Sequence, residues 1–121
     1  MFKDVGAVVT LASPDGGKPP LDPKSDDVSA ETPATIRFKV DTVANEQLAN
    51  TAKLQDVDAS NFDAVFYPGG HGPLWDLIDN EQSIKLIEAF WTQGKPVSAV
   101  CHAPIALVNA KDENGEFIVK G

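Results

Sequence analysis

The sequence predicts an α/β domain with a largely parallel sheet flanked by helices. Three short runs have the apolar, β-branched composition of strands buried on both faces: GAVVTLA (6–12), FDAVFYPGG (62–70) and KPVSAV (95–100). Segments with helical periodicity separate these runs along the chain. Strands that alternate with helices are typical of parallel sheets.

The N-terminal part of the chain is predicted to form two strands joined by a long loop. The first strand, 6–12, ends at SPDGGKPPLDPKSDD, and this composition predicts a Pro/Gly/Asp-rich loop over 13–34. In TIRFKVD (35–41) apolar and polar side chains alternate, which is the period of a half-exposed strand.

Two helices are predicted in the middle of the chain. TVANEQLANTAKL (42–54) has apolar residues at helical spacing, with Thr42 as the expected N-cap. NEQSIKLIEAFWTQG (80–94) has the clearest apolar helix face in the chain. We expect Asp79 to cap its start and Gly94 to end it.

The C-terminal part is predicted to hold a short helix and a final strand. APIALVNA (103–110) tolerates a proline in its first turn, and KDENGEFIVKG (111–121) contains a turn at Asn114-Gly115 that leads into the strand. The chain contains no internal repeat or low-complexity tract, so residues 1–121 are predicted to form a single domain.

Charge and composition exclude several classes of protein. The net charge of -8 disfavours nucleic acid and anionic membranes as partners, because both attract clustered Lys and Arg. No apolar run approaches the roughly 18 residues that span a bilayer, and Asp4 interrupts the apolar stretch that an export signal would need. A single cysteine fits a reducing compartment, and we expect a cytoplasmic location.

The stretch SAVCHAP (98–104) contains the only cysteine, Cys101, at the predicted junction of strand 95–100 and helix 103–110. Ligands of parallel sheets bind at the carboxyl ends of strands, and a helix N-terminus favours the thiolate form of a cysteine. The alternative is that Cys101 is a small apolar residue that packs in the core. Position and composition alone leave both interpretations open.

The histidine that follows, His102, is a candidate general base or thiolate-stabilising group. Adjacent residues on a regular helix do not face each other, so His102 can serve Cys101 only if the turn between them is irregular. The alternative is that His102 caps the helix.

A second motif, PGGHGPLWD (68–76), follows strand 62–70 and is expected at the same edge of the sheet. Gly69 and Gly70 would let backbone N–H groups approach a ligand closely, as an oxyanion hole requires, with His71 beside them; the alternative is a plain tight turn. No Walker lysine, GxGxxG, HxxxH or CxxC spacing occurs, so we expect neither a metal nor another cofactor.

Together the motifs resemble the ThiJ/PfpI group of the class I glutamine amidotransferase-like superfamily. Within it, the chain resembles the branch of heat-shock chaperones and glutathione-independent glyoxalases over essentially its whole length. The resemblance implies a flavodoxin-like sandwich with Cys101 as the nucleophile and His102 as its partner. It also implies an oxyanion site at the N–H groups of Gly70 and His102.

The function implied by the resemblance is a cofactor-free glyoxalase or a protein deglycase. In the glyoxalase reaction, the thiolate adds to the aldehyde of methylglyoxal, a proton moves between the two carbons, and hydrolysis releases lactate. A holdase chaperone with a redox-sensitive cysteine and a cysteine peptidase are the alternatives. Small 2-oxoaldehydes are therefore the expected substrates.

The resemblance also implies that two carboxylates of the family site lie outside residues 1–121. One is a glutamate that meets the cysteine, and the other is the acid that orients the histidine. The fold is therefore expected to be incomplete at both ends, with sheet edges and apolar surface exposed. We expect a homo-oligomer such as a dimer, or completion by another fragment, and low activity for the chain alone.

Overall fold

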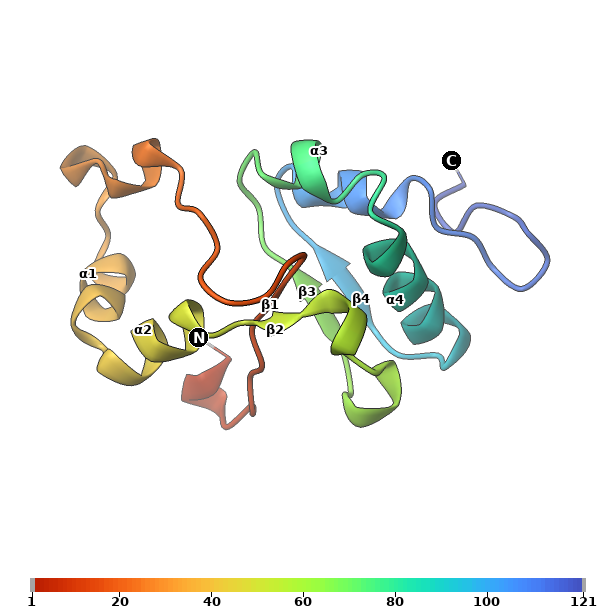
Figure 1. The fold of residues 1–121 in the computed structure, drawn as a ribbon, viewed down its shortest axis with the longest axis horizontal. Helices are drawn as coiled ribbons and strands as arrows, with labels where there is room; N and C mark the ends of the chain where they lie inside the picture. The colour runs from red at the N-terminus through yellow and green to blue at the C-terminus, as the bar shows by residue number, and fades with distance from the viewer. Residues whose placement is uncertain (1, 121) are drawn as a thin grey trace. The chain divides into compact units, whose positions relative to one another are not determined.

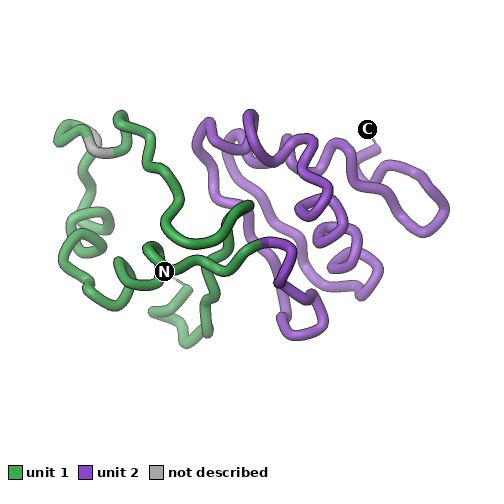
Figure 2. Tube along the Cα trace, viewed as in Figure 1, with its two compact units in different colours: residues 1–53 green, residues 54–121 purple. Residues whose placement is uncertain are grey.

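The computed structural model describes the backbone of residues 2–120 and their side chains except those of Asp26 and Ala30. The chain divides into two compact units, Met1–Lys53 and Leu54–Gly121 (Figure 2). The α/β class with parallel strands is confirmed within them. That all of 1–121 forms a single domain stays a prediction.

The first unit is built on a short parallel strand pair. Strand β1 (Ala12–Ser13) pairs with β2 (Ala52–Lys53), with Ala12 opposite Ala52. The segment between them holds two α-helices, α1 (Pro33–Val40) and α2 (Thr42–Ala49), and short 3-10 turns that include Pro23–Asp26 and Val28–Ala30. Most of the segment predicted as a loop over 13–34 lies outside helices and strands; the exceptions are Ser13 in β1, a β-bridge between Gly17 and Thr51, these turns, and the start of α1 at Pro33.

The strand predicted over 35–41 is wrong, because this segment forms helix α1. A capping box starts the helix: the Thr35 N–H donates to the Thr32 hydroxyl at 3.2 Å, and the Thr32 N–H donates to the Thr35 hydroxyl at 2.8 Å. Pro33, at the first helical position, has a backbone angle that suits a helix. No side chain of α1 is buried, so alternating polarity did not indicate a buried strand face here.

The two predictions on either side of α1 also need correction. Of the helix predicted over 42–54, only Thr42–Ala49 is helical, as α2, and Ala52–Lys53 form strand β2. The cap of α2 is the Asp41 carboxylate, which accepts from the Ala44 N–H at 2.9 Å, and not Thr42. Of the strand predicted over 6–12, only residue 12 pairs in β1, and Val8 is 98% exposed. A strand needs a hydrogen-bonded neighbour, and β2 begins to pair only at the Leu11 carbonyl.

The second unit contains the two parallel strands and the long helix between them that were predicted, and also a short helix at 73–76 that was not (Figure 1). Strands β3 (Val65–Tyr67) and β4 (Val97–Ala99) are parallel, with Val65 opposite Val97 and Tyr67 opposite Ala99. Helices α3 (Pro73–Asp76) and α4 (Glu81–Thr92) connect them, and 3-10 helices lie at Leu54–Asp56, Ala59–Asn61 and Ala103–Leu107. Both strands lie inside their predicted ranges and are shorter.

Helix α4 is confirmed, with one difference at its start. The Asn80 side chain caps it by accepting from the N–H groups of Gln82 and Ser83 at 3.1 and 2.9 Å. The Asp79 carboxylate, predicted as the cap, instead accepts from the Asn109 amide. Gly94 ends the helix as predicted, with a φ of 66° that L-residues with side chains rarely adopt.

The segment after β4 differs from the prediction in its helix type and in its last strand. The helix predicted over 103–110 is a 3-10 helix, Ala103–Leu107. The predicted final strand is reduced to one antiparallel bridge between Lys111 and Phe117, around a turn at Gly115. Gly121 lies outside the described residues.

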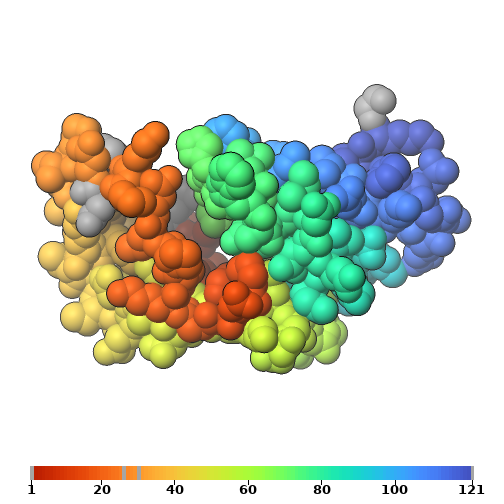
Figure 3. Space-filling view, turned by 45° about the horizontal axis from the view of Figure 1, so that its top comes forward, coloured from red at the N-terminus to blue at the C-terminus, as the bar shows by residue number. Residues whose placement is uncertain are grey.

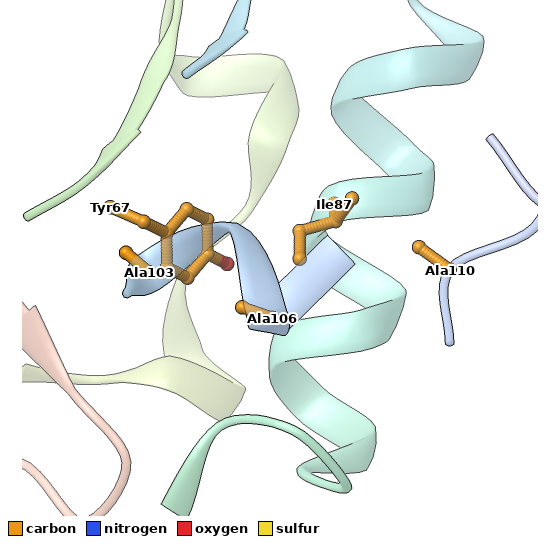
Figure 4. Close-up of a cluster of buried hydrophobic side chains, with 5 residues drawn as sticks. All are labelled: Tyr67, Ile87, Ala103, Ala106 and Ala110. Atoms are coloured by element: carbon orange, nitrogen blue, oxygen red, sulfur yellow. The ribbon is translucent and has the colours of Figure 1, made fainter. Parts of the chain in front are cut away.

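The core of the second unit lies between α4, the Ala103–Leu107 helix and one face of the β3–β4 pair. One cluster consists of the buried residues Tyr67, Ile87, Ala103, Ala106 and Ala110 (Figure 4). A second consists of Leu54, Ala59, Leu86 and Phe90. The small alanines let the 3-10 helix approach the strands closely. No helix within residues 2–120 has the length and apolar character needed to cross a membrane.

A buried polar pair inside this core gives a first testable prediction. The Tyr67 and Ser83 hydroxyls share a hydrogen bond of 3.1 Å, and burial raises the pKa of the Tyr67 phenol. Tyr67→Phe or Ser83→Ala alone leaves a buried hydroxyl without this partner and should cost about 1–3 kcal/mol of unfolding free energy. The double variant should cost less than the two single costs added together, as measured by urea unfolding. Strictly additive costs would contradict the coupling.

Candidate active site

Two loops meet at the carboxyl edge of the β3–β4 pair. Because the strands are parallel, the segments that follow them leave the sheet at the same edge. The ladder continues to the Val100 N–H, which donates to the Tyr67 carbonyl at 3.3 Å. Pro68 and Val100 are the next residues in this register, and Gly69 and Cys101 follow them, so the two sequence motifs lie side by side.

The contact between the loops is closest at Gly69. A Cβ added to Gly69 would lie 2.6 Å from Cys101 Cβ and 3.1 Å from the Val100 carbonyl oxygen. Nonbonded carbon atoms normally lie about 3.5–4.0 Å apart, so only glycine fits at this position. The need for a glycine therefore comes from the cysteine that packs against it.

Cys101 forms a sharp turn between strand and helix. It is the one described residue other than glycine with a positive φ, 61°, a conformation that costs a residue with a side chain about 1–3 kcal/mol. The turn is closed by the Ala103 N–H, which donates to the Val100 carbonyl at 3.1 Å. Its thiol is free and Cys101 is exposed, so the side chain does not pack in the core.

His102 faces the cysteine because of this irregular turn. Its Nδ1 lies 3.2 Å from Cys101 Sγ, within the range for a hydrogen bond to sulfur. His102 precedes the Ala103–Leu107 helix, but its side chain makes no capping hydrogen bond. The imidazole is therefore directed to the thiol and not to the helix.

His71 lies against the other histidine. The centroids of the His71 and His102 rings are 4.7 Å apart, with an angle of 35° between the ring planes. The His71 carbonyl accepts from the Leu74 N–H at 3.0 Å, at the start of α3. A thiol and two imidazoles are thus gathered at one exposed edge of the sheet.

The last residue of the predicted set, Gly70, lies between Gly69 and His71 with a φ of 100°. A Cβ added to it would meet no atom within 4 Å, so backbone geometry and not packing demands glycine at this position. Within residues 2–120, no three His, Cys, Asp or Glu residues lie together in a way that could hold a metal ion.

These features agree with the comparison to known proteins. Residues 1–118 match the DJ-1/PfpI family. The chain belongs to this family. The resemblance to the ThiJ/PfpI group drawn from the motifs is therefore confirmed.

Individual members are similar over different lengths. General stress protein 18 of Bacillus subtilis is 32% identical over 114 residues, which are 94% of this chain and 55% of that protein. Glyoxalase 3 of Candida albicans is 35% identical over 83 residues, or 68% of this chain and 35% of that protein. The crystal structure of glyoxalase III from Candida albicans superposes with a TM-score of 0.85 at 31% identity, covering 99% of this chain and 51% of that one.

The chain thus spans about half the length of the DJ-1/PfpI relatives that it matches. Over that span its backbone follows the solved relative, so the expected flavodoxin-like fold is confirmed for this part.

Sequence reasoning missed the buried residues that pack next to this site. The Tyr67 ring packs beside Ala103 and Ala106 in the core (Figure 4), and Ala103 follows Cys101 by two residues. Helix α3 and the Ala103–Leu107 helix lie side by side on the surface (Figure 3). A signal was available for Tyr67, since a tyrosine in a buried strand needs a polar partner within the core.

Proposed function

We propose that this chain carries the nucleophile of a cysteine-dependent, cofactor-free glyoxalase that acts on small 2-oxoaldehydes. The observation that supports it is the 3.2 Å approach of His102 Nδ1 to Cys101 Sγ, on a turn that presents the thiol to solvent. Nucleophile and base within hydrogen-bond reach are the signature of an activated nucleophile. The relatives named as glyoxalases supply the substrate class.

The first step is addition of the thiol to the aldehyde. His102 accepts the thiol proton at Nδ1, and the sulfur attacks the aldehyde carbon to form a hemithioacetal. The negative charge that develops on the aldehyde oxygen needs hydrogen-bond donors fixed in advance. We assign this role to the N–H groups of Gly70 and His102, with Gly69 and His71 lining the substrate side.

In the second step the former aldehyde carbon loses its proton and the neighbouring carbonyl carbon gains one, while the hydroxyl proton of the hemithioacetal is lost and the oxygen of the second carbon is protonated. The first carbon is thereby oxidised to a thioester and the second is reduced to an alcohol, so no external oxidant or reductant is consumed. Water then hydrolyses the thioester, which releases a 2-hydroxy acid and regenerates the Cys101 thiol. Methylglyoxal and water give lactate, in agreement with a site that needs no cofactor.

The test is consumption of methylglyoxal and formation of lactate in the absence of glutathione. We expect Cys101→Ala to reduce both to the uncatalysed background, because no other cysteine is present in the chain. Lys85→Ala is the matched control: Lys85 is an exposed residue of α4 whose side chain is 66% accessible. Equal rates for the protein and Cys101→Ala would refute the proposal.

Association with another polypeptide is part of the same proposal, with a homodimer as the first expectation. Phe66 and Val100, at the β3–β4 pair, are 43% and 44% exposed. Val8 of the first unit is 98% exposed. Apolar surface of this kind favours association. Size-exclusion chromatography with light scattering should give a mass above that of the monomer, and a well-folded monomer would count against it.

A stress-related holdase chaperone is the second candidate function. Trp75, in the helix that follows the glycine loop, is 82% exposed, and an exposed tryptophan suits the binding of unfolded clients. General stress protein 18 is a relative with a stress-related name. Suppression of the aggregation of a model client that is unchanged in Cys101→Ala would favour this function.

A further inference from the structure

We propose that His71 is a positioning residue for the nucleophile: its ring holds the His102 imidazole in the orientation that meets the Cys101 thiol. The inference rests on the proposed function for its catalytic consequence. The effect of the ring contact on the reactivity of the Cys101 thiol can be measured whether or not the chain has the proposed glyoxalase activity.

The two histidines come from different loops but form one ring pair. His71 follows β3 and His102 follows β4, and their ring centroids are 4.7 Å apart at an angle of 35°. Flat rings attract each other when their centroids lie about 4.5–7 Å apart in offset or tilted arrangements. The pair therefore has the geometry of a favourable contact.

His102 needs such a contact because little else restrains its side chain. It is exposed, and its side chain does not cap the helix that follows. The terminal torsion of a histidine side chain is broad and roughly two-fold, so an unrestrained ring turns Nδ1 away from the thiol for part of the time. Within the described part of the chain, this ring makes a polar contact with Cys101 Sγ and a ring contact with His71.

His71 is itself well placed to act as a fixed support. Its carbonyl accepts from the Leu74 N–H at 3.0 Å, which ties the backbone of His71 to the first turn of α3. Pro73 in that turn is buried, and α3 packs against the Ala103–Leu107 helix that begins directly after His102. His71 therefore directly precedes, and His102 adjoins, one of two helices that pack against each other.

The size of the expected effect follows from the strength of a ring pair. Contacts between aromatic rings contribute about 0.5–1.5 kcal/mol, which corresponds to a change of about 2- to 12-fold in the population of the held orientation. Loss of the His71 ring should slow any reaction of the thiol that depends on His102 by this factor. Substrate affinity should change less than the rate of the chemical step.

The experiment makes two kinds of measurement on the full chain. One is the rate of Cys101 alkylation by iodoacetamide at pH 7, and the other is a kinetic assay that gives kcat and KM for methylglyoxal without glutathione. The variants are His71→Ala, which removes the ring, His71→Leu, which keeps bulk without a flat ring, and His71→Phe, which keeps the ring without its nitrogens. Circular dichroism checks that each variant is folded. Lys85→Ala on the exposed face of α4 is the control.

We expect His71→Ala and His71→Leu to lower both the alkylation rate and kcat about 2- to 12-fold. His71→Phe should remain within about 2-fold of the original protein. Two results overturn the proposal. If the alkylation rate and kcat of His71→Phe fall as far as those of His71→Leu, the imidazole nitrogens of His71 are required and the ring contact alone does not suffice. If neither His71→Leu nor His71→Ala changes the alkylation rate, the ring pair does not position His102.

The two readouts separate this inference from the proposed function. Alkylation depends only on the reactivity of the thiol, whereas kcat depends also on the glyoxalase reaction. A chain that converts no methylglyoxal but shows the expected alkylation pattern would refute the proposed function and support the role of His71. If all His71 variants convert methylglyoxal equally well and their alkylation rates are unchanged, the proposed function is supported and the role of His71 is refuted.

Discussion

Gly69→Ala is expected to lower the proposed Cys101-dependent conversion of methylglyoxal about 100-fold while the protein still folds. The new Cβ would lie 2.6 Å from Cys101 Cβ and 3.1 Å from the Val100 carbonyl oxygen, so the two loops must separate. One of the contacted atoms belongs to the backbone and the other is the first atom of a side chain, so neither can move by rotation alone. Displacement of a reacting group by about 1 Å is enough to cost roughly two orders of magnitude in rate.

The effect on stability should be smaller than the effect on rate. Overpacking of this kind costs about 1–3 kcal/mol, and the site lies at an exposed edge of the sheet where loops can shift. Thermal unfolding of Gly69→Ala should therefore remain cooperative, with a lower midpoint. The rate of Cys101 alkylation reports on the displaced thiol and should change even where no substrate is converted.

Gly72→Ala in the same loop is the matched control. A Cβ on Gly72 would meet no atom within 4 Å, and its φ of -47° is open to any residue. The same chemical change should therefore alter stability by less than about 1 kcal/mol and leave the conversion rate unaltered. Equal losses of conversion rate in Gly69→Ala and Gly72→Ala would mean that the loop needs flexibility in general and that contact with Cys101 is not the cause.

The place of the site could be predicted from the sequence because it depends on topology. Two neighbouring parallel strands bring the residues after them to one edge, so Gly69 and Cys101 had to lie close together once β3 and β4 were identified. The prediction that these strands are buried on both faces is wrong, because the middle residues of β3 and β4, Phe66 and Ser98, are exposed. The ring pair of His71 and His102 could not be predicted, because it depends on side-chain directions after each turn. Sequence spacing carries no information about those directions across two loops.

The errors in the first unit have a different cause. Over 35–41, alternation predicted a strand, but the capping box of Thr32 and Thr35 stabilises a helix locally, and no buried face opposes it. Over 6–12, apolar composition predicted burial, whereas Val8 is exposed. Composition indicates what a segment would gain from being covered, but it does not say whether a neighbouring element covers it.

Phe90→Ala is expected to be the most destabilising substitution in the second unit, at about 3–5 kcal/mol of unfolding free energy. Phe90 is 1% exposed and packs with Leu54, Ala59 and Leu86, which lie on three different segments of the chain. Its removal takes a large buried surface away and leaves a cavity that these short segments cannot readily close. Domains are stable by only about 5–15 kcal/mol, so a large fraction of the total would be lost.

Trp91→Ala is the matched control because it removes a still larger ring from the next position of α4. Trp91 is 49% exposed, so its truncation should cost about 1 kcal/mol or less. The free energy of unfolding falls by about 1–3 kcal/mol per molar urea. Phe90→Ala should therefore lower the urea concentration at the unfolding midpoint by more than about 1 M, and Trp91→Ala by clearly less. The reverse order would mean that α4 presents its other face to the core.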